Sequence, residues 1–216
     1  MRLLAVSDIH LEKQNVSLLR ESLGGAPIDA VIMAGDFTSH GSEFAAEEIL
    51  RELRLMGKVF ALPGNLDTKG VAELLENKGV SIHNKFVLFA NYKIVGFGGA
   101  LVGGAGHINF SEKEIEKSLS KLLEGDNSKT ILVTHIPPFG TSLDVSRSGE
   151  HIGSKAVKKI IETKQPLLHL CGHVHEASGE ELFGKTLSVN IGALKHGKAA
   201  RIDLNGKIGI ERIELF

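Results

Sequence analysis

Short apolar runs alternate with amphipathic stretches along the first eighty residues of the chain. Residues 3–6 form a near-continuous apolar run, which is typical of a strand buried on both faces. Further runs of this kind occupy residues 28–34, 59–62, 130–134 and 167–171. Apolar residues at helical spacing predict helices over residues 15–23, 42–56 and 68–78. This alternation of strands and helices predicts a parallel or mostly parallel sheet.

The pattern changes after residue 82. Two strand-like runs, at 86–89 and 92–97, predict a hairpin, and the glycine-rich residues 98–109 predict a mobile surface loop. Ser111 and Glu114 form the capping-box pattern of a helix that reaches residue 123. Later elements are a helix after Gly153-Ser154 and strands at 187–191, 199–204 and 208–213. Without an internal repeat or a linker, we predict one domain over residues 1–216, with two sheets facing each other and helices outside.

Five of the predicted buried strands end in residue types that bind metals. The residues are Asp8 and His10, Asp36, Asn65 and Asp67, His135, and His173 and His175. In open α/β sheets, ligands gather beyond the carboxyl ends of the strands, so we expect these side chains to converge. In an extended loop, His173 and His175 would point to opposite sides, which suits two neighbouring metal ions better than one.

Two aspartates, one asparagine and four histidines are too many for one tetrahedral zinc ion, which takes four ligands. They suit two ions that share a bridging carboxylate, and the imidazoles favour transition metals over calcium or magnesium. Two divalent cations outweigh two carboxylates and a hydroxide, so the site should attract an anion. Two metals about 3.5–4 Å apart can bind a phosphate and lower the pKa of a bridging water. This predicts hydrolysis of a phosphate ester by a metal-bridging hydroxide.

Composition indicates the class of protein and the compartment in which this chemistry would take place. The chain has 216 residues, of which 42% are hydrophobic and 24% charged, as in ordinary soluble globular proteins. Its net charge of −1 leaves no basic surface for long nucleic acid or an anionic membrane. The first apolar run meets Asp8 too early for a signal peptide, and a single cysteine fits a reducing compartment. We therefore expect a cytoplasmic protein.

Five motifs together resemble those of the calcineurin-like metallophosphoesterases, in the family's order. They are Asp8-Ile9-His10, Gly35-Asp36, Gly64-Asn65-Leu66-Asp67, His135 and Gly172-His173-Val174-His175. The stretch from His135 through residues 149–155 to Glu176 is similar to the small Icc-like phosphoesterases of bacteria and archaea. The resemblance implies an α/β fold, the four-layer αββα sandwich of two mixed β-sheets flanked by helices that is known as the metallo-dependent phosphatase fold.

The resemblance also implies a role for each ligand. Asp8, His10 and His175 would bind the first metal, and Asp36 would bridge the two. Asn65, His135 and His173 would bind the second metal. The expected cofactors are two divalent transition-metal ions, with manganese as the first choice and iron, zinc, cobalt or nickel as alternatives. Asp36 and Asn65 would thereby also take part in catalysis.

One position departs from the family's pattern. Many members carry a histidine after the asparagine, where it stabilises the transferring phosphoryl group or protonates the leaving oxygen, but this chain has Leu66. We therefore expect a preference for good leaving groups, unless another acid substitutes. His151 and His196 are the candidates, both on polar loops, and we predict that His151 contacts the substrate.

Other residues of the same types have alternative explanations. Asp67 could orient a ligand, or equally cap the helix that starts near residue 68. His107 lies in the glycine-rich loop and could reach the site. Structural roles are expected for His40, His83, His169 and Cys171.

Phosphodiesters are the leading substrate class, and a nucleotide is one option for the small phosphoester. Two alternatives stay open: a phosphomonoesterase or protein phosphatase, and a non-catalytic interaction scaffold that retains the fold. We expect neither a membrane nor long nucleic acid as a partner, and a homo-oligomer remains an option.

Overall fold

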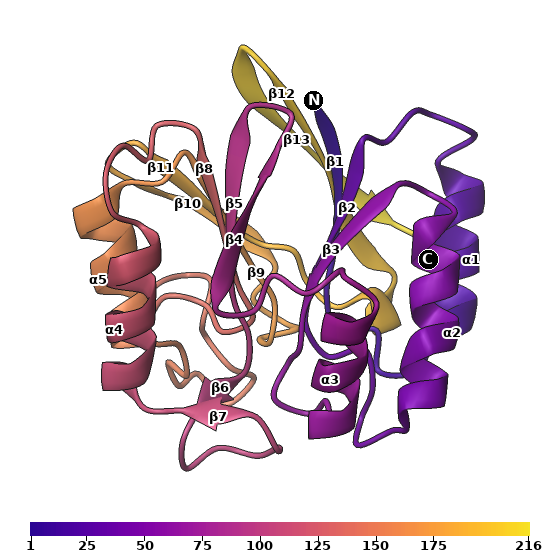
Figure 1. The fold of residues 1–216 in the computed structure, drawn as a ribbon, viewed down its shortest axis with the longest axis horizontal. Helices are drawn as coiled ribbons and strands as arrows, with labels where there is room; N and C mark the ends of the chain where they lie inside the picture. Colours follow the sequence, from indigo (N-terminus) through magenta and orange to yellow (C-terminus); the bar gives the residue numbers. More distant parts are fainter.

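The computed structural model describes all of residues 1–216 and consists of two β-sheets that lie between two layers of helices (Figure 1). The first sheet has the strand order β13-β12-β1-β2-β3, and the second has the order β10-β11-β9-β8-β5-β4. The strands of the first sheet are β1 (Arg2–Val6), β2 (Ala30–Ala34), β3 (Lys58–Leu62), β12 (Lys198–Asn205) and β13 (Lys207–Glu214). The strands of the second are β4 (Lys85–Phe89), β5 (Tyr92–Phe97), β8 (Thr130–Thr134), β9 (Leu168–Cys171), β10 (Gly179–Phe183) and β11 (Thr186–Asn190).

Both sheets are mixed, with a parallel centre and antiparallel edges. In the first sheet β1, β2 and β3 run parallel, while β12 and β13 are antiparallel to their neighbours. In the second sheet β5, β8, β9 and β11 run parallel, while β4 and β10 form antiparallel edges. The parallel strands therefore present their carboxyl ends at one side of each sheet, where loops can meet.

The helices cover the outer faces of the two sheets, and four of them begin at a capping side chain. The helices α1 (Lys13–Ser22), α2 (Glu43–Arg54) and α3 (Lys69–Asn77) cover the first sheet, and α4 (Glu112–Leu122) and α5 (Lys155–Lys164) cover the second (Figure 1). Backbone N–H groups in the first turn of four helices donate to a cap hydroxyl, which satisfies an otherwise orphaned donor. The cap residues are Ser42, Thr68, Ser111 and Ser154. Ser111 and Glu114 form the expected capping box.

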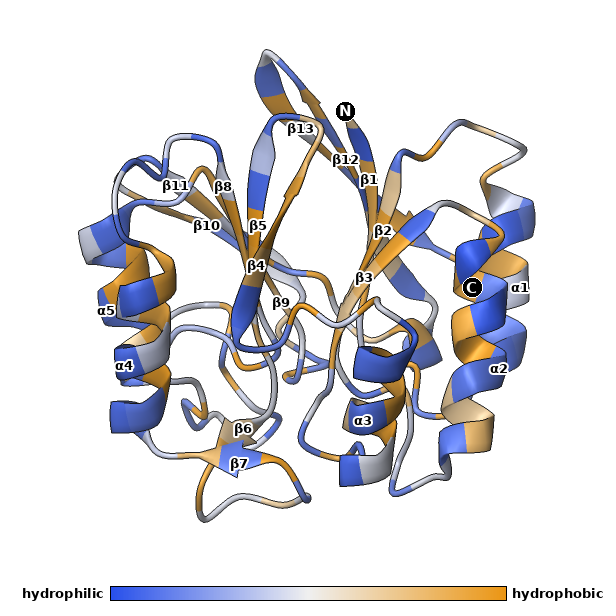
Figure 2. Cartoon of the chain, viewed as in Figure 1, coloured by the Kyte–Doolittle hydropathy of each residue, from blue (hydrophilic) through white to orange (hydrophobic).

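Three apolar cores separate the four layers, and alternate residues of one strand enter different cores. Leu4 and Val6 pack with the helices of the first layer, whereas Leu3 and Ala5 pack between the two sheets. A third core lies between the second sheet and the helices α4 and α5. Figure 2 shows the same arrangement as hydrophobic strands and helix faces turned inward. The continuous apolar runs are thus explained by burial on both faces, and the expected four-layer αββα fold is confirmed.

Two segments differ from the sequence-based expectation. The glycine-rich residues 98–109 contain a short strand, β6 (Ala100–Leu101), which pairs in parallel with β7 (Asn109–Phe110). The edge strand β10 was not predicted, because its only large apolar residues are Leu182 and Phe183 and Leu182 is exposed. The five strands with ligands at their ends were all predicted correctly.

The longest helices in the chain have at most twelve residues. No helix has both the length and the apolar character needed to cross a membrane.

Candidate metal centre

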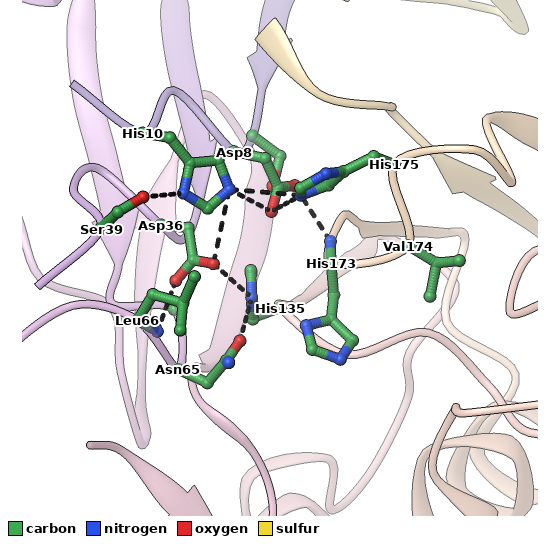
Figure 3. Close-up of polar contacts among 12 residues, drawn as sticks. Asp8, His10, Asp36, Ser39, Asn65, Leu66, His135, His173, Val174 and His175 are labelled. Carbon is green, nitrogen blue, oxygen red and sulfur yellow. Dashed lines mark hydrogen bonds and ion pairs between the residues drawn. The ribbon is translucent and has the colours of Figure 1, made fainter. Parts of the chain in front are cut away.

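The loops that follow β1, β2, β3, β8 and β9 meet at one edge of the sandwich, and they bring seven side chains together. Figure 3 shows these residues gathered in one place from segments that are far apart in the sequence. They are Asp8, His10, Asp36, Asn65, His135, His173 and His175, the seven residues that the sequence singled out as ligands. Two sets of three ligand atoms each lie within 4.8 Å of one another, and both sets contain Asp8.

The first set consists of Asp8, His10 and His175. His175 Nε2 lies 3.1 Å from Asp8 Oδ1 and 3.2 Å from His10 Nε2. His10 Nε2 lies 3.7 Å from the same Asp8 oxygen. Three atoms with lone pairs thus face a common point, which is the arrangement that a cation stabilises.

The second set consists of Asp8, Asp36 and His135. His135 Nε2 lies 3.5 Å from Asp36 Oδ2 and 2.9 Å from Asn65 Oδ1. Asn65 Nδ2 donates to the carbonyl oxygen of Ala105 at 2.9 Å, which fixes the amide so that its oxygen faces His135. Asp36 Oδ2 also lies 3.8 Å from His10 Nε2, so this carboxylate stands between the two sets.

His173 and His175 lie on different sides of the centre, as their spacing predicts. The backbone N–H of His173 donates to Asp8 Oδ2 at 3.0 Å, but its ring turns toward His135, with ring centroids 5.0 Å apart. The ring of His175 instead packs against His10, with ring centroids 5.1 Å apart (Figure 3). The two imidazoles therefore face different neighbours within the centre.

Hydrogen bonds to the far ring nitrogens orient two of the histidines. His10 Nδ1 bonds to the hydroxyl of Ser39 at 2.8 Å, and His135 Nδ1 donates to the carbonyl oxygen of Ala34 at 2.8 Å. Both contacts leave Nε2 aimed into the centre. Partners of this kind fix the ring orientation of metal-binding histidines in proteins. Nothing in the sequence around Ser39 marked it for this role.

The backbone around the centre is held in conformations that most residues avoid. Asp8, His10, Asp36 and His173 all have positive φ, between 50° and 68°. Such values cost of order 1–3 kcal/mol each and cluster at functional sites. Close approaches also require glycine nearby, because a Cβ on Gly64 would overlap the Asp36 carboxylate and one on Gly172 would overlap that of Asp8.

Burial and neighbouring groups shift the pKa values of three side chains in the centre. Burial by itself would raise the pKa of Asp8, but hydrogen bonds from His10 and His175 outweigh it and hold the pKa well below its usual value. Burial would lower the pKa of His135, but the carboxylates of Asp36 and Asp8 raise it to about 9. Burial lowers the pKa of His173 to about 4, which favours the neutral imidazole that binds metals.

Asp67 is a positioning residue for this centre rather than a helix cap. Its carboxylate accepts the backbone N–H groups of Phe37, Thr38 and Gly64 at 2.9–3.2 Å, and the Thr38 hydroxyl at 3.1 Å. The cap of α3 is Thr68. Asp67 thus joins the loop that carries Asp36 to the loop that carries Asn65. Burial and then the charge of Asp36 raise its pKa to about 6.

The donor set itself fits divalent cations. His135 directs Nδ1 at the oxygen of Ala34, and directs Nε2 at the oxygens of Asn65 and Asp36. A neutral imidazole carries one proton and cannot donate from both nitrogens, so a second proton or a cation must lie between Nε2 and these oxygens. His10 and His175 also direct Nε2 at each other and at Asp8, so a cation at this point would replace the proton that they share.

The loop around Leu66 brings two further histidines close to the centre. The backbone N–H of Leu66 donates to Asp36 Oδ1 at 2.8 Å, and its carbonyl oxygen accepts the N–H of His40 at 2.9 Å. His107 donates its backbone N–H to the Asn65 carbonyl oxygen at 2.7 Å, and its ring hydrogen-bonds to His40 at 2.8 Å. His107 thus reaches the second ligand loop, but its ring bonds to His40 rather than to a ligand.

The two candidates for replacing the missing family histidine, His196 and His151, have partners of their own. The ring of His196 packs against His175, with centroids 5.8 Å apart. His151 Nδ1 bonds to the buried Asp144 at 2.7 Å, and this histidine contacts none of the seven ligand side chains. His169 and Cys171 have structural surroundings. His169 is buried and hydrogen-bonded to Thr134 and Ser188, and burial raises the pKa of the Cys171 thiol, which keeps it protonated.

Comparison with protein families gives one clear match. Residues 48–213 match the family described as metallophosphoesterase, calcineurin superfamily. A relative in Methanocaldococcus jannaschii, the uncharacterized protein MJ1162, is 32% identical over 196 residues, which cover 88% of this chain and 87% of that protein.

Solved structures share the fold at low sequence identity. The TT1561 protein of Thermus thermophilus superposes with a TM-score of 0.76 at 18% identity, covering 100% of this chain and 99% of that one. A dimetal phosphatase from Danio rerio superposes with a TM-score of 0.72 at 12% identity, covering 100% of this chain and 96% of that one. Both likenesses concern the fold.

Proposed function

Because this chain belongs to the calcineurin superfamily of metallophosphoesterases, we propose that it hydrolyses phosphodiesters at a centre of two divalent transition-metal ions. One observation carries the proposal. Asp36 Oδ2 lies 3.5 Å from His135 Nε2 and 3.8 Å from His10 Nε2, between two groups of ligand atoms. A carboxylate in this position can bind two cations at once.

Each ligand has a position in this proposal. Asp8, His10 and His175 would hold one ion, and Asn65, His135 and His173 would hold the other, with Asp36 between them. Asp8 belongs to both sets of ligand atoms, so it also limits how far apart the two ions can lie. Manganese is the first choice, because four imidazoles favour transition metals and two aspartates with one amide keep the site from being soft.

Two bound cations would supply a nucleophile at neutral pH and neutralise the negative charge of the phosphate. The protein contributes the orientation of the ligands. Leu66 donates its backbone N–H to Asp36, and Asp67 fixes the loops on either side of it. The Asn65 amide, held by Ala105, keeps its oxygen toward the centre. The aliphatic side chain of Leu66 cannot protonate a leaving group.

Leu66 is the reason to favour good leaving groups, and the preference for diesters rests on Leu66 together with analogy to the family. A basic alkoxide needs a proton as it departs, whereas a less basic leaving oxygen does not. His151 is the candidate for contact with the substrate, because Asp144 binds its Nδ1 and leaves Nε2 free. The loop that carries His151 is tied to the centre, since Asn190 Nδ2 donates to the carbonyl oxygens of Leu143 and Val174.

The direct test is a panel of metals and substrates. Protein stripped of metal is reloaded with manganese, iron, cobalt, nickel or zinc, and is assayed with bis-p-nitrophenyl phosphate and p-nitrophenyl phosphate side by side. We expect turnover to depend on metal and the diester to be the better substrate. A higher kcat/KM for the monoester with every metal would instead favour a phosphomonoesterase.

A substitution tests the role of His151. His151→Ala should lower kcat/KM on the diester about tenfold, while His83→Ala, which changes a histidine away from the centre, should not. Unchanged kinetics of His151→Ala would remove this role.

A non-catalytic scaffold is the second candidate, and Leu66 is the observation that favours it. It predicts binding of two metal equivalents without turnover of any phosphoester. The gathering of four histidines around one centre argues against it, because an interaction surface does not need them there.

A further inference from the structure

The strand β13 forms one edge of the first sheet, and no other strand of the chain pairs with its outer side. It has eight residues, whereas the edge strands β3, β4 and β10 have five each. Its pairing with β12 runs without a bulge, from Asn205 opposite Lys207 to Lys198 opposite Glu214. The strand also contains no proline. An edge with neither a bulge nor a proline can accept another strand.

Alternate residues of β13 direct their backbone N–H and C=O groups away from β12. The Leu215 N–H donates to the Gly197 carbonyl oxygen at 3.0 Å, in the same register as the strand pairs. In an antiparallel pair, such hydrogen-bonded positions recur at every second residue. The odd-numbered residues of β13 therefore bond toward β12, and Ile208 and Ile210 present their backbone groups at the open edge. Figure 1 shows the tip of the β12–β13 hairpin projecting beyond the rest of the molecule.

The side chains of this part of β13 match those of a second copy of the same strand. When two antiparallel copies meet at Gly209, Lys207 of one copy lies opposite Glu211 of the other. Ile208 likewise lies opposite Ile210, and each of these contacts occurs twice because the pairing is symmetric. The residues with free backbone groups thus meet one another, so the hydrogen bonds of the ladder can form. Registers shifted by two residues lose the charge match, because they place Lys207 or Glu211 opposite Gly209.

The charges at this edge are available to a second copy. Lys207 is exposed and forms no ion pair within the chain. The Glu211 carboxylate pairs with Arg201, but its side chain remains 58% exposed. In the paired sheet this carboxylate would lie between Arg201 and Lys207 of the second copy, so the charges would alternate across the interface. Opposite charges at opposed positions stabilise antiparallel strands, and like charges destabilise them.

We propose that β13 is the interface of a homodimer, in which two copies pair antiparallel about Gly209 and join their first sheets into one continuous sheet. The contact consists of residues 207–211 of each copy, so the dimer should be weak, with a Kd on the order of 10–100 μM. It lies at the end of the sheet away from the metal centre, because β12 runs antiparallel to β1 and Asp203 pairs with Arg2. The interface is therefore independent of the proposed function.

Charge reversal tests the pairing. Sedimentation of the full-length wild-type protein at about 5–500 μM should show a shift from monomer to dimer as concentration rises. Lys207→Glu and Glu211→Lys should each weaken the dimer about tenfold or more, because like charges then oppose one another at two places. An equimolar mixture of the two single variants should form a heterodimer, because one variant then supplies carboxylates at both positions and the other supplies ammonium groups.

Lys113→Glu, which makes the same change of charge at an exposed position in the first turn of α4, is the control and should keep the wild-type dimer. A wild-type protein that stays monomeric at about 500 μM would overturn the proposal. A dimer that Lys207→Glu weakens no more than Lys113→Glu does would overturn it as well, and so would a mixture of the two single variants that stays monomeric.

A disulfide tests the register of the two strands. Gly209 is exposed, and a Cβ there would meet only the Cβ of Asp203, at 3.8 Å, so Gly209→Cys should fold. In the proposed register the two introduced thiols face each other in a non-hydrogen-bonded pair, whose Cα atoms are about 4.5 Å apart, and a disulfide can form. The native Cys171 is buried. Oxidation should therefore link Gly209→Cys into a covalent dimer and leave Lys113→Cys mostly monomeric. Equal cross-linking of the two variants would overturn the proposed interface.

Discussion

Asp67 and Asp36 are both buried aspartates in loops at the carboxyl ends of neighbouring strands, but their surroundings differ. Asp67 accepts four hydrogen bonds, three of them from backbone N–H groups. Asp36 accepts one, from the N–H of Leu66, and its second oxygen faces the imidazoles of His135 and His10 at 3.5 and 3.8 Å. The carboxylate of Asp67 thus has its hydrogen-bonding capacity filled, whereas that of Asp36 faces other candidate ligands.

This difference separates a carboxylate that holds the loops from one that is available to a cation. A buried carboxylate without sufficient hydrogen bonds is costly, and it persists when another positive group compensates it. In Asp67 the compensation is the backbone. In Asp36 it is the proton on His135 or, in our proposal, the metal ions. The predictions below change one carboxylate or its surroundings at a time.

The largest effect is expected for Asp36→Asn. Loss of the bridging charge should lower kcat/KM on bis-p-nitrophenyl phosphate by about 10³-fold, since one metal-bridging carboxylate is worth several kcal/mol in the transition state. Metal content measured by elemental analysis should fall below two equivalents. Above about pH 9, where His135 has lost its proton, the metal-free variant should have a free energy of unfolding within about 1 kcal/mol of the wild type, because the amide can still accept the Leu66 N–H.

Asp203→Asn is the control for this substitution, because Asp203 pairs with Arg2 at the other end of β1. It should keep both the metal content and the activity. If Asp36→Asn retained two metal equivalents and wild-type turnover, Asp36 would not be the bridging ligand.

Asp67→Asn should act on stability more than Asp36→Asn does. Its amide nitrogen would face backbone donors, and unsatisfied buried groups cost about 1–3 kcal/mol. We expect a melting temperature lower by about 5–10 °C and metal affinity reduced about 10–100-fold, because the ligand loops lose their connection. Thermal unfolding with and without metal measures both. An unchanged melting temperature would show that these hydrogen bonds do not stabilise the fold.

The metal-free protein should lose stability as pH rises from about 6.5 to 9. The folded pKa of His135 is about 9, above its ordinary value of 6.5, so its stabilising proton is fully bound below pH 6.5 and is lost as pH rises through 9. The loss should be on the order of 1–3 kcal/mol. A bound metal replaces that proton, so metal affinity should rise over the same interval.

Melting temperatures in a chelator at pH 6.5, 7.5 and 9 measure how the stability of the metal-free protein depends on pH. Metal titrations at the same pH values measure how metal affinity depends on pH. His135→Gln should flatten both. A metal-free slope that stayed the same in His135→Gln would assign the titration to another group.

The smallest effect is expected for Leu66→His, which places a proton donor beside Asp36. Leu66 is half-buried, and its backbone bonds to Asp36 and His40 do not depend on its side chain. Hydrolysis of diesters with alkyl leaving groups should rise about tenfold, while p-nitrophenyl esters should change less. Leu66→Gln is the matched control, since it is polar but not acidic. An equal gain in both variants would contradict the role of the missing histidine, and so would a shallow dependence of the wild-type rate on leaving-group pKa.

Much of the fold and the positions of the candidate ligands at the strand ends could be predicted from the sequence, because the strands are buried on both faces. Their continuous apolar runs located the strand ends, and parallel strands must place those ends at one edge. The fold is confirmed, while the metal roles of the seven side chains stay a prediction. Asp67 was left undecided, because a carboxylate before a helix can cap it or bind elsewhere, and only the three-dimensional partners distinguish the two.

Contacts between distant loops could not be predicted. Ser39 supports His10, and Ala105 fixes the Asn65 amide, but neither residue type indicates such a role by its position in the sequence. Residues 98–109 were predicted to be a mobile loop, because a glycine-rich sequence gives no sign of long-range contacts. In the structure, backbone hydrogen bonds join Gly99 to Pro63 and His107 to Asn65.

The central claim is that Asp36 bridges two cations held by the five strand ends. Anomalous diffraction from crystals of the manganese-loaded protein tests it most directly. The account predicts two manganese peaks about 3.5–4 Å apart, with the Asp36 carboxylate between them, Asp8, His10 and His175 around one and Asn65, His135 and His173 around the other. A single peak, or two peaks that Asp36 does not touch, would contradict it.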